Sequence, residues 1–146
     1  MKHAAYIIAQ ATWGMPQTLL GGAVYLAHRK RPHFRFHGAV VTTWESQKGL
    51  SLGPFIFLKG PAAGNCGPND VDVALLVHEY GHTMQSIMFG PLYLVVVGVP
   101  SVIWMNVPAL AKRRQLKQVS YYSFGPERHA SALGERALGD GFRASH

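Results

Sequence analysis

Two long stretches of the chain contain no Asp, Glu, Lys or Arg: residues 3–28 and 80–111. The first is long enough to cross the core of a bilayer, which requires about 20 residues. Two glutamines and a Gly-Met-Pro break at 14–16 interrupt its apolar character. Because no clean small-x-small cleavage site is present and a basic run follows at once, we expect residues 1–30 to form an uncleaved, membrane-associated segment.

The second stretch is most apolar over residues 87–111, and the basic cluster 112–117 follows it. Its composition is typical of a membrane segment, but four residues favour bends: Pro91, Gly98, Pro100 and Pro108. The positive-inside rule places this cluster and the basic cluster 29–35 on the cytoplasmic side. A straight crossing would separate the clusters, so we expect 87–111 to bend, re-enter or lie on the membrane surface. The alternative is a buried core segment of a compact domain.

The middle of the chain predicts a small β structure. Residues 38–44 and 50–58 are rich in β-branched and aromatic side chains, and the polar connection 45–49, which contains a glycine, separates them. Two such runs joined by a loop of this length are typical of a β-hairpin. We therefore expect a hairpin followed by a loop over 59–68.

A helix is expected over residues 71–89. Asn69 or Asp70 can cap its N-terminus, and the helix macrodipole favours the acidic residues Asp70 and Asp72 in the first turn. Gly90-Pro91 provides the stop.

This predicted helix contains His78-Glu79-Tyr80-Gly81-His82, the HExxH pattern. Residues i and i+4 of a helix point the same way, about 6 Å apart, so His78 and His82 can bind one Zn²⁺. Glu79 projects beside the metal, where its carboxylate can take a proton from an activated water. We predict two metal ligands and a general base for peptide hydrolysis. The alternative, two surface histidines on an amphipathic helix, is disfavoured because apolar neighbours leave little polar face.

Zinc needs a third protein ligand, and the candidates lie further along the chain. Pro126 at a first helical position predicts a second helix, with Glu127 in its first turn. Glu127 is the favoured ligand. His129, on a different face of that helix, and Asp140, in a Gly-Asp-Gly segment, are the alternatives.

An HExxH helix followed by a glutamate early on a later helix resembles the gluzincin-type, thermolysin-like metallopeptidases. The block 78–86, with residues 38–41, 51–53, 90–93 and 121–124, more closely resembles a small bacterial family of membrane-associated proteins with an HEYGHT motif. The resemblance covers most of residues 10–134. It implies a zincin-like α+β fold, a Zn²⁺ cofactor, a peptide or protein substrate and a place at the bacterial cytoplasmic membrane.

The resemblance also implies further site residues. In gluzincins an aspartate four residues after the ligand glutamate orients a histidine, and Ser131 stands at that position here. A serine can accept a hydrogen bond from an imidazole but supplies no charge. Tyr121 or Tyr122 can donate to the oxyanion of a tetrahedral intermediate, although core packing is the commoner role for such tyrosines. By analogy, one strand of the predicted hairpin would pair with an extended substrate.

Composition limits the classes of protein that remain. The chain has 146 residues, of which 48% are hydrophobic and 14% charged, so it is one domain in size and too apolar for disorder. Its single cysteine, Cys66, excludes an intrachain disulfide and an all-Cys metal site. We therefore expect residues 31–146 to form one zincin-like metal-binding domain, with 87–111 dipping into the membrane.

The charge balance supplies a second class of function. With 14 Lys+Arg against 7 Asp+Glu, the net charge is +7. This suits a non-catalytic, basic membrane-surface or nucleic-acid-binding protein whose histidines hold a structural or relict zinc. The basic clusters are short and carry few aromatic residues, which disfavours nucleic acid and favours lipid headgroups. His28, His33 and His37 either contribute to such a basic surface or form a second metal site.

Overall fold

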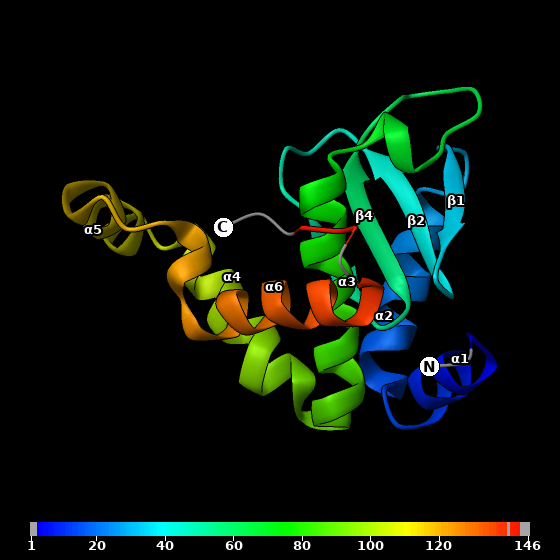
Figure 1. Ribbon diagram of the computed structural model, residues 1–146, viewed down its shortest axis with the longest axis horizontal. Helices are drawn as coiled ribbons and strands as arrows, with labels where there is room; N and C mark the ends of the chain where they lie inside the picture. The colour runs from blue at the N-terminus through cyan, green and yellow to red at the C-terminus, as the bar shows by residue number, and fades with distance from the viewer. Residues whose placement is uncertain (1–2, 140, 144–146) are drawn as a thin grey trace.

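The computed structural model describes residues 3–139 and 141–143. This part of the chain is an α+β fold, as the sequence predicts, with six α-helices and one four-stranded sheet (Figure 1). The elements are α1 (His3–Thr12), α2 (Met15–Ala27), β1 (His33–Phe36), β2 (Ala39–Trp44), β3 (Leu50–Leu52), β4 (Phe55–Lys59), η1 (Pro68–Asp70), α3 (Val73–Phe89), η2 (Gly90–Leu92), η3 (Leu94–Gly98), α4 (Val99–Asn106), α5 (Pro108–Lys117), η4 (Tyr121–Ser123) and α6 (Gly125–Leu138).

The sheet has the strand order β1-β2-β4-β3 and mixes both pairing directions. β1 and β2 are antiparallel, β2 and β4 are parallel, and β3 and β4 are antiparallel. The predicted hairpin between 38–44 and 50–58 is therefore wrong. The second run is itself a hairpin, because Gly53 turns the chain with φ +59° before Pro54. A side chain at Gly53 would overlap Thr18 of α2, so packing also requires glycine there.

Helices cover both faces of the sheet. On one face, Val41, Ile56 and Leu58 pack against Leu76 and Tyr80 of α3, and all five side chains are buried. On the other face α2 packs on β4, where the rings of Tyr25 and Phe55 stack with centroids 5.5 Å apart. Successive side chains of β4 point to opposite faces, so one set packs against α2 and the other against α3. The packing against α3 fixes the position of the helix that carries HExxH.

The glutamines of the first charge-free stretch fasten α1 and α2 to α3. Buried Gln10 donates to the carbonyl oxygen of Thr83 at 2.8 Å and accepts from the Ser86 hydroxyl at 2.8 Å. Buried Gln17 donates to Ser86 Oγ at 2.8 Å and to the carbonyl oxygen of Gly90 at 2.9 Å. Both amide nitrogens and the Gln10 oxygen are thus paired within the protein, whereas the Gln17 oxygen is buried without a partner among the described residues.

Neither charge-free stretch forms one long helix. The first is divided between α1 and α2. By length and composition, no single described helix suffices to cross a membrane, whereas one pair, 73–92 with 94–106, does so only with a bend of 118° between its halves. The bend that the sequence predicts within 87–111 is therefore present.

Helices α3 and α6 cross at very short range. A methyl group added to Gly81 would overlap the carbonyl oxygen of Ala130, and one added to Gly134 would overlap that of Val77. Figure 1 shows α6 lying across α3. This crossing brings the start of α6 to the HExxH turn of α3.

Candidate metal centre

Helix α3 presents His78, Glu79 and His82 from a buried turn. Its N-cap is Asp72, whose carboxylate accepts from the backbone N–H of Leu75 at 3.1 Å, so the expected caps Asn69 and Asp70 are wrong. Asp70 instead closes the short turn η1 by accepting from the backbone N–H of Gly67. The helix ends at Phe89, as predicted, and begins two residues later than expected.

Helix α6 brings Glu127 to the two histidines. Pro126 opens the helix and Glu127 lies in its first turn, as the sequence predicts. The Oε2 atom of Glu127 is 3.0 Å from His78 Nε2 and 3.2 Å from His82 Nε2. All three residues are buried, and their potential ligand atoms lie within 4.8 Å of one another. In tetrahedral zinc sites adjacent ligand atoms are about 3.3 Å apart, so the spacing suits a metal ion.

Neighbouring side chains orient both imidazole rings. Gln85 donates from Nε2 to the carbonyl oxygen of Pro126 at 2.8 Å, which fixes its amide orientation. Its Oε1 therefore accepts from His82 Nδ1, 2.8 Å away, and in neutral His82 the Nε2 lone pair faces Glu127. His78 Nδ1 is 2.9 Å from Ser131 Oγ, so the expected contact between this serine and one of the histidines is present. Such outer contacts set the tautomer of metal-binding histidines.

This arrangement places two hydrogen-bond acceptors, the Nε2 lone pair of His82 and the carboxylate of Glu127, against each other. A cation or a proton must therefore lie between them. Neutral His82 points a lone pair at a carboxylate oxygen, and the second oxygen of Glu127, Oε1, is buried without a hydrogen-bond partner among the described residues. Buried acceptors facing one another are costly unless a positive group lies between them. The donor set of two imidazoles and one carboxylate fits a divalent metal ion.

The electrostatics of the cluster follow the same logic. Burial alone would raise the pKa of Glu127, but its hydrogen bonds with His78 and His82 outweigh burial and hold that pKa well below its usual range. Burial alone would lower the pKa of His82, but the hydrogen bond with Glu127 and the charge of Glu79 raise it above its ordinary value. Without a metal, these directions favour a protonated His82 beside an ionised Glu127, so the positive imidazole balances the negative carboxylate.

Glu79 lies beside the cluster and is held by a strand of the sheet. Its Oε2 accepts from the Ser51 hydroxyl of β3 at 2.5 Å, and its side chain is almost fully buried. A methyl group at Gly49 would overlap the other carboxylate oxygen, so the chain before β3 closes over Glu79. The carboxylate is thus confined next to, and not within, the His-His-Glu group.

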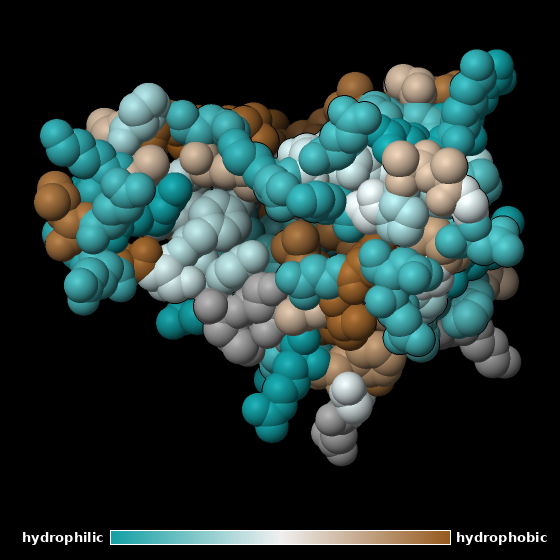
Figure 2. Space-filling view, turned by 90° about the horizontal axis from the view of Figure 1, so that it is seen from above, coloured by the Kyte–Doolittle hydropathy of each residue, from teal (hydrophilic) through white to brown (hydrophobic). Residues whose placement is uncertain are grey.

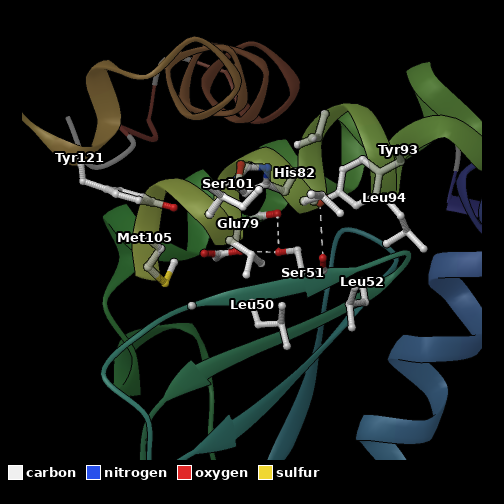
Figure 3. A pocket seen from close by; sticks show the side chains of 16 residues that line it. Leu50, Ser51, Leu52, Glu79, His82, Tyr93, Leu94, Ser101, Met105 and Tyr121 are labelled. Carbon is white, nitrogen blue, oxygen red and sulfur yellow. Dashed lines mark hydrogen bonds between the residues drawn. The ribbon is translucent and has the colours of Figure 1, made fainter. Parts of the chain in front are cut away.

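Two cavities flank Glu79. The larger, of about 410 Å³, is bordered by β3, by His82 and by the apolar side chains of η3 and α4 (Figure 3). The smaller, of about 220 Å³, lies towards His78 and is bordered by the loop 47–49 and Tyr122. Gly49, Glu79, Met105 and Tyr121 border both. The two cavities therefore offer space on either side of the carboxylate.

The paired tyrosines take different positions. Tyr121 lines both cavities, and Figure 3 shows its hydroxyl directed towards Glu79. Burial, with the negative charges of Glu127 and Glu79, raises the pKa of Tyr121, so its phenol keeps its proton. Tyr122 packs edge-on against the His78 ring with centroids 4.8 Å apart. Tyr121 is the better placed donor of the pair.

The other candidate residues lie elsewhere. His129 is outside the cluster, with Nδ1 3.1 Å from Gln85 Nε2. Asp140 lies outside the described residues. His28, His33 and His37 rest against different aromatic rings, of Trp44, Tyr25 and Phe36 respectively. In the described part of the chain, His78, His82 and Glu127 are the one group of three with metal-binding spacing.

Two residues of the site were not found by sequence reasoning. Gln85 follows the motif by three residues on α3, so the i, i+3 spacing from His82 was the available signal. Ser51 offered none, because its approach to Glu79 depends on the fold of the sheet over α3. Compared with known proteins, the chain matches no family model, no curated protein and no solved structure.

Proposed function

We propose that the protein is a zinc-dependent peptidase whose metal is held by His78, His82 and Glu127. The observation that carries this proposal is the buried group of two imidazoles and one carboxylate with a separate carboxylate, Glu79, confined beside it at a cavity. Imidazole and carboxylate ligands in a three-residue set are typical of catalytic zinc, which keeps a position open. Zinc bound there would supply Lewis acidity to a peptide carbonyl and to a water.

The chain's own residues supply the proton transfers. Glu79 takes a proton from the attacking water and returns it to the leaving amine, and Ser51 holds its carboxylate during both steps. Tyr121 donates a hydrogen bond to the oxyanion that forms on the former carbonyl oxygen. Gln85 and Ser131 keep the two imidazoles in place throughout.

The surroundings of Glu79 suit an extended peptide. β3 is an edge strand of the described sheet and borders the larger cavity, so a substrate backbone can lie along it. The cavities on the two sides of Glu79 accept the side chains that flank the scissile bond. Leu50, Leu94 and Val97 line the larger cavity, so it accepts an apolar side chain.

The test is to separate metal binding from catalysis with Glu79→Gln. The amide keeps the shape and the hydrogen bond from Ser51 but cannot accept a proton, so zinc content should stay at one per chain while peptide turnover falls about 10²–10⁴-fold. Zinc content and turnover are measured on the same preparations. His82→Ala is the companion variant and should lose both.

Other outcomes point to the second class of function. If the wild type binds one zinc but cleaves nothing across a broad peptide library, the peptidase proposal fails and the site is a structural or relict one. Equal turnover by wild type and Glu79→Gln would remove the proposed role of Glu79. A chain without stoichiometric zinc would overturn the metal assignment itself.

A further inference from the structure

The two charge-free stretches of the sequence meet in one exposed apolar surface. Trp13, between α1 and α2, lies against Gly90 at the end of α3, and Gln17 bonds to the Gly90 carbonyl oxygen. The elements that flank this junction carry exposed apolar side chains, and six of those that are more than half exposed are what we call the apolar face: Ile8, Trp13, Leu19, Leu92, Val95 and Val99. Exposed apolar side chains gathered on neighbouring elements are typical of an interaction surface.

The apolar face lies on one side of the molecule. In Figure 1, α1 and the segment from the end of α3 to η3 lie at the bottom, whereas the loop before α3 lies at the top. That loop ends in Asp70 and Asp72. Seen from above, the molecule is mostly hydrophilic, with hydrophobic atoms mainly at the upper edge of the picture and near its centre (Figure 2). The face seen in Figure 2 is thus the more hydrophilic one, and the end of α3 and η3 lie at the other end of the molecule in Figure 1.

The basic helix that follows the apolar face in the sequence indicates the partner's chemistry. Helix α5 continues directly from α4 and carries four basic residues, Lys112, Arg113, Arg114 and Lys117, without an acidic one. A second copy of the chain would oppose a net charge of +7 with another +7, which disfavours close association. An anionic lipid surface instead complements both the apolar side chains and the basic helix.

We propose that the apolar face inserts into one leaflet of an anionic lipid bilayer, with the basic side chains of α5 at the lipid phosphates. The bend of 118° between the halves 73–92 and 94–106 suits this arrangement, because it turns the apolar segment back and away from a straight crossing. Trp13 at the junction suits the headgroup boundary, where tryptophan is favoured.

This placement has a consequence for the metal centre. Val99, Val102 and Ile103 line the larger cavity and are each about half exposed, so the rim of the cavity is continuous with the apolar face. Substrate then reaches the cavity from the lipid side, as an apolar peptide segment held at the bilayer. This consequence rests on the proposed peptidase function, whereas lipid binding itself does not.

The first test is flotation of the full chain with phosphatidylglycerol-containing vesicles and with phosphatidylcholine vesicles. The wild type should float with the anionic vesicles, and Ile8→Glu with Val95→Glu should lower the bound fraction at least about tenfold, because buried charge in lipid is costly. Val73→Glu is the matched control, since Val73 is an exposed apolar residue at the opposite end of α3. It should bind as the wild type does. Arg113→Glu with Lys117→Glu should weaken binding to the anionic vesicles alone.

The second test measures depth with brominated lipids and chains that retain one tryptophan. With Trp44→Phe and Trp104→Phe, the remaining Trp13 should be strongly quenched. With Trp13→Phe and Trp104→Phe, the remaining Trp44, which contacts His28 far from Trp13, should not be quenched. Circular dichroism and a cooperative thermal transition confirm that each variant is folded, independently of any metal.

Three results overturn the proposal: no vesicle binding by the wild type, equal binding by the Ile8→Glu, Val95→Glu variant, or equal quenching of the two tryptophans. A stable dimer in sedimentation experiments, without vesicle binding, would assign the apolar face to a second copy. His82→Ala should bind vesicles as the wild type does. Vesicle binding without peptide turnover would therefore reject the peptidase and keep the lipid surface.

Discussion

At the scale of single residues, hydrogen bonds around the histidines decide what the site can bind. The Gln85 amide is fixed by the carbonyl oxygen of Pro126, so it accepts from His82 Nδ1 and directs the other nitrogen inward. Ser131 contacts the equivalent nitrogen of His78. Gln85 and Ser131 are thus the two side chains that orient the imidazole rings.

Ser51 is predicted to position Glu79 without contributing to metal binding. Ser51→Ala removes a hydrogen bond to a charged group, worth about 1.5–3 kcal/mol, so kcat should fall about ten- to hundredfold. Zinc content and KM should change little, because Ser51 contacts none of the three proposed ligands. Ser46→Ala, at an exposed serine in the loop before β3, is the control. An unchanged kcat would show that Glu79 is held by other contacts.

The pKa shifts of His82 and Glu127 predict how the free energy of unfolding of the metal-free protein depends on pH. The raised pKa of His82 stabilises the metal-free fold fully below 6.5, and that contribution is lost as the pH rises through the folded value. The lowered pKa of Glu127 stabilises it above 4.5, and that contribution is lost as the pH falls through the folded value. The metal-free protein should gain most from the cluster between these two pH values.

Zinc should bind more tightly as the pH rises, because it must displace a proton from the cluster. The stability gained from zinc therefore increases in the pH range where the metal-free cluster loses its own contribution. The increase in Tm on adding zinc should therefore grow from pH 5.5 to pH 8, with proton release on binding. Thermal denaturation with and without zinc across this range measures the first quantity, and titration calorimetry in buffers of different ionisation enthalpy measures the second. A Tm increase independent of pH would contradict the protonated His82.

At the scale of elements, the α3–α6 crossing joins the two halves of the site. Gly81 lies inside the HExxH motif, where the chemistry leaves the residue type free, and packing against Ala130 is what requires glycine there. Gly134 has the same role on α6, against Val77. The close approach keeps Glu127 at 3.0 Å and 3.2 Å from the two histidines.

Gly134→Ala should therefore separate the helices and weaken the site. The added methyl group overlaps backbone, so the free energy of unfolding should fall by about 1–3 kcal/mol, against a helix-propensity gain of about 1 kcal/mol, and zinc should bind more weakly. Gly125→Ala in the same helix meets no atom nearby and is the matched control. Denaturant unfolding and zinc titration measure both effects. Equal behaviour of the two variants would show that the crossing adapts.

At the scale of the whole molecule, the group of His78, His82 and Glu127 links α3, which is held in the core by the sheet, to α6. The core side chains Leu76 and Tyr80 are on α3 and contact the sheet, independently of the cluster. α6 depends on its crossing with α3 and on Glu127. Metal binding should therefore stabilise the two regions unequally.

Removal of zinc by a chelator should loosen α6 first. With free zinc at about 1,000 times Kd, metal binding stabilises every conformation in which the three ligands are together by about 4 kcal/mol, and the chelator removes this stabilisation. Amide exchange in residues 125–138 should then accelerate by up to about a thousandfold, whereas β2 and β4 should change far less. Hydrogen exchange with and without chelator tests this, and uniform acceleration across the chain would indicate one cooperative unit.

The sequence by itself determined the local parts of the site. Helix α3 ends where Gly90-Pro91 predicts, and α6 starts with Pro126 and Glu127 in its first turn, because caps and stops are encoded within a few neighbouring residues. The His78–His82 spacing needs only one helical turn.

Tertiary structure alone decided the rest. The parallel pairing of β2 with β4, the contact of Ser51 with Glu79 and the junction of Trp13 with Gly90 each join segments whose own residues carry no signal for the partner. The glutamines that interrupt a membrane-like stretch prove to be buried links to α3. Such contacts follow from how the whole core packs and not from local preference, because strand partners and side-chain neighbours are chosen by long-range burial and hydrogen-bond satisfaction.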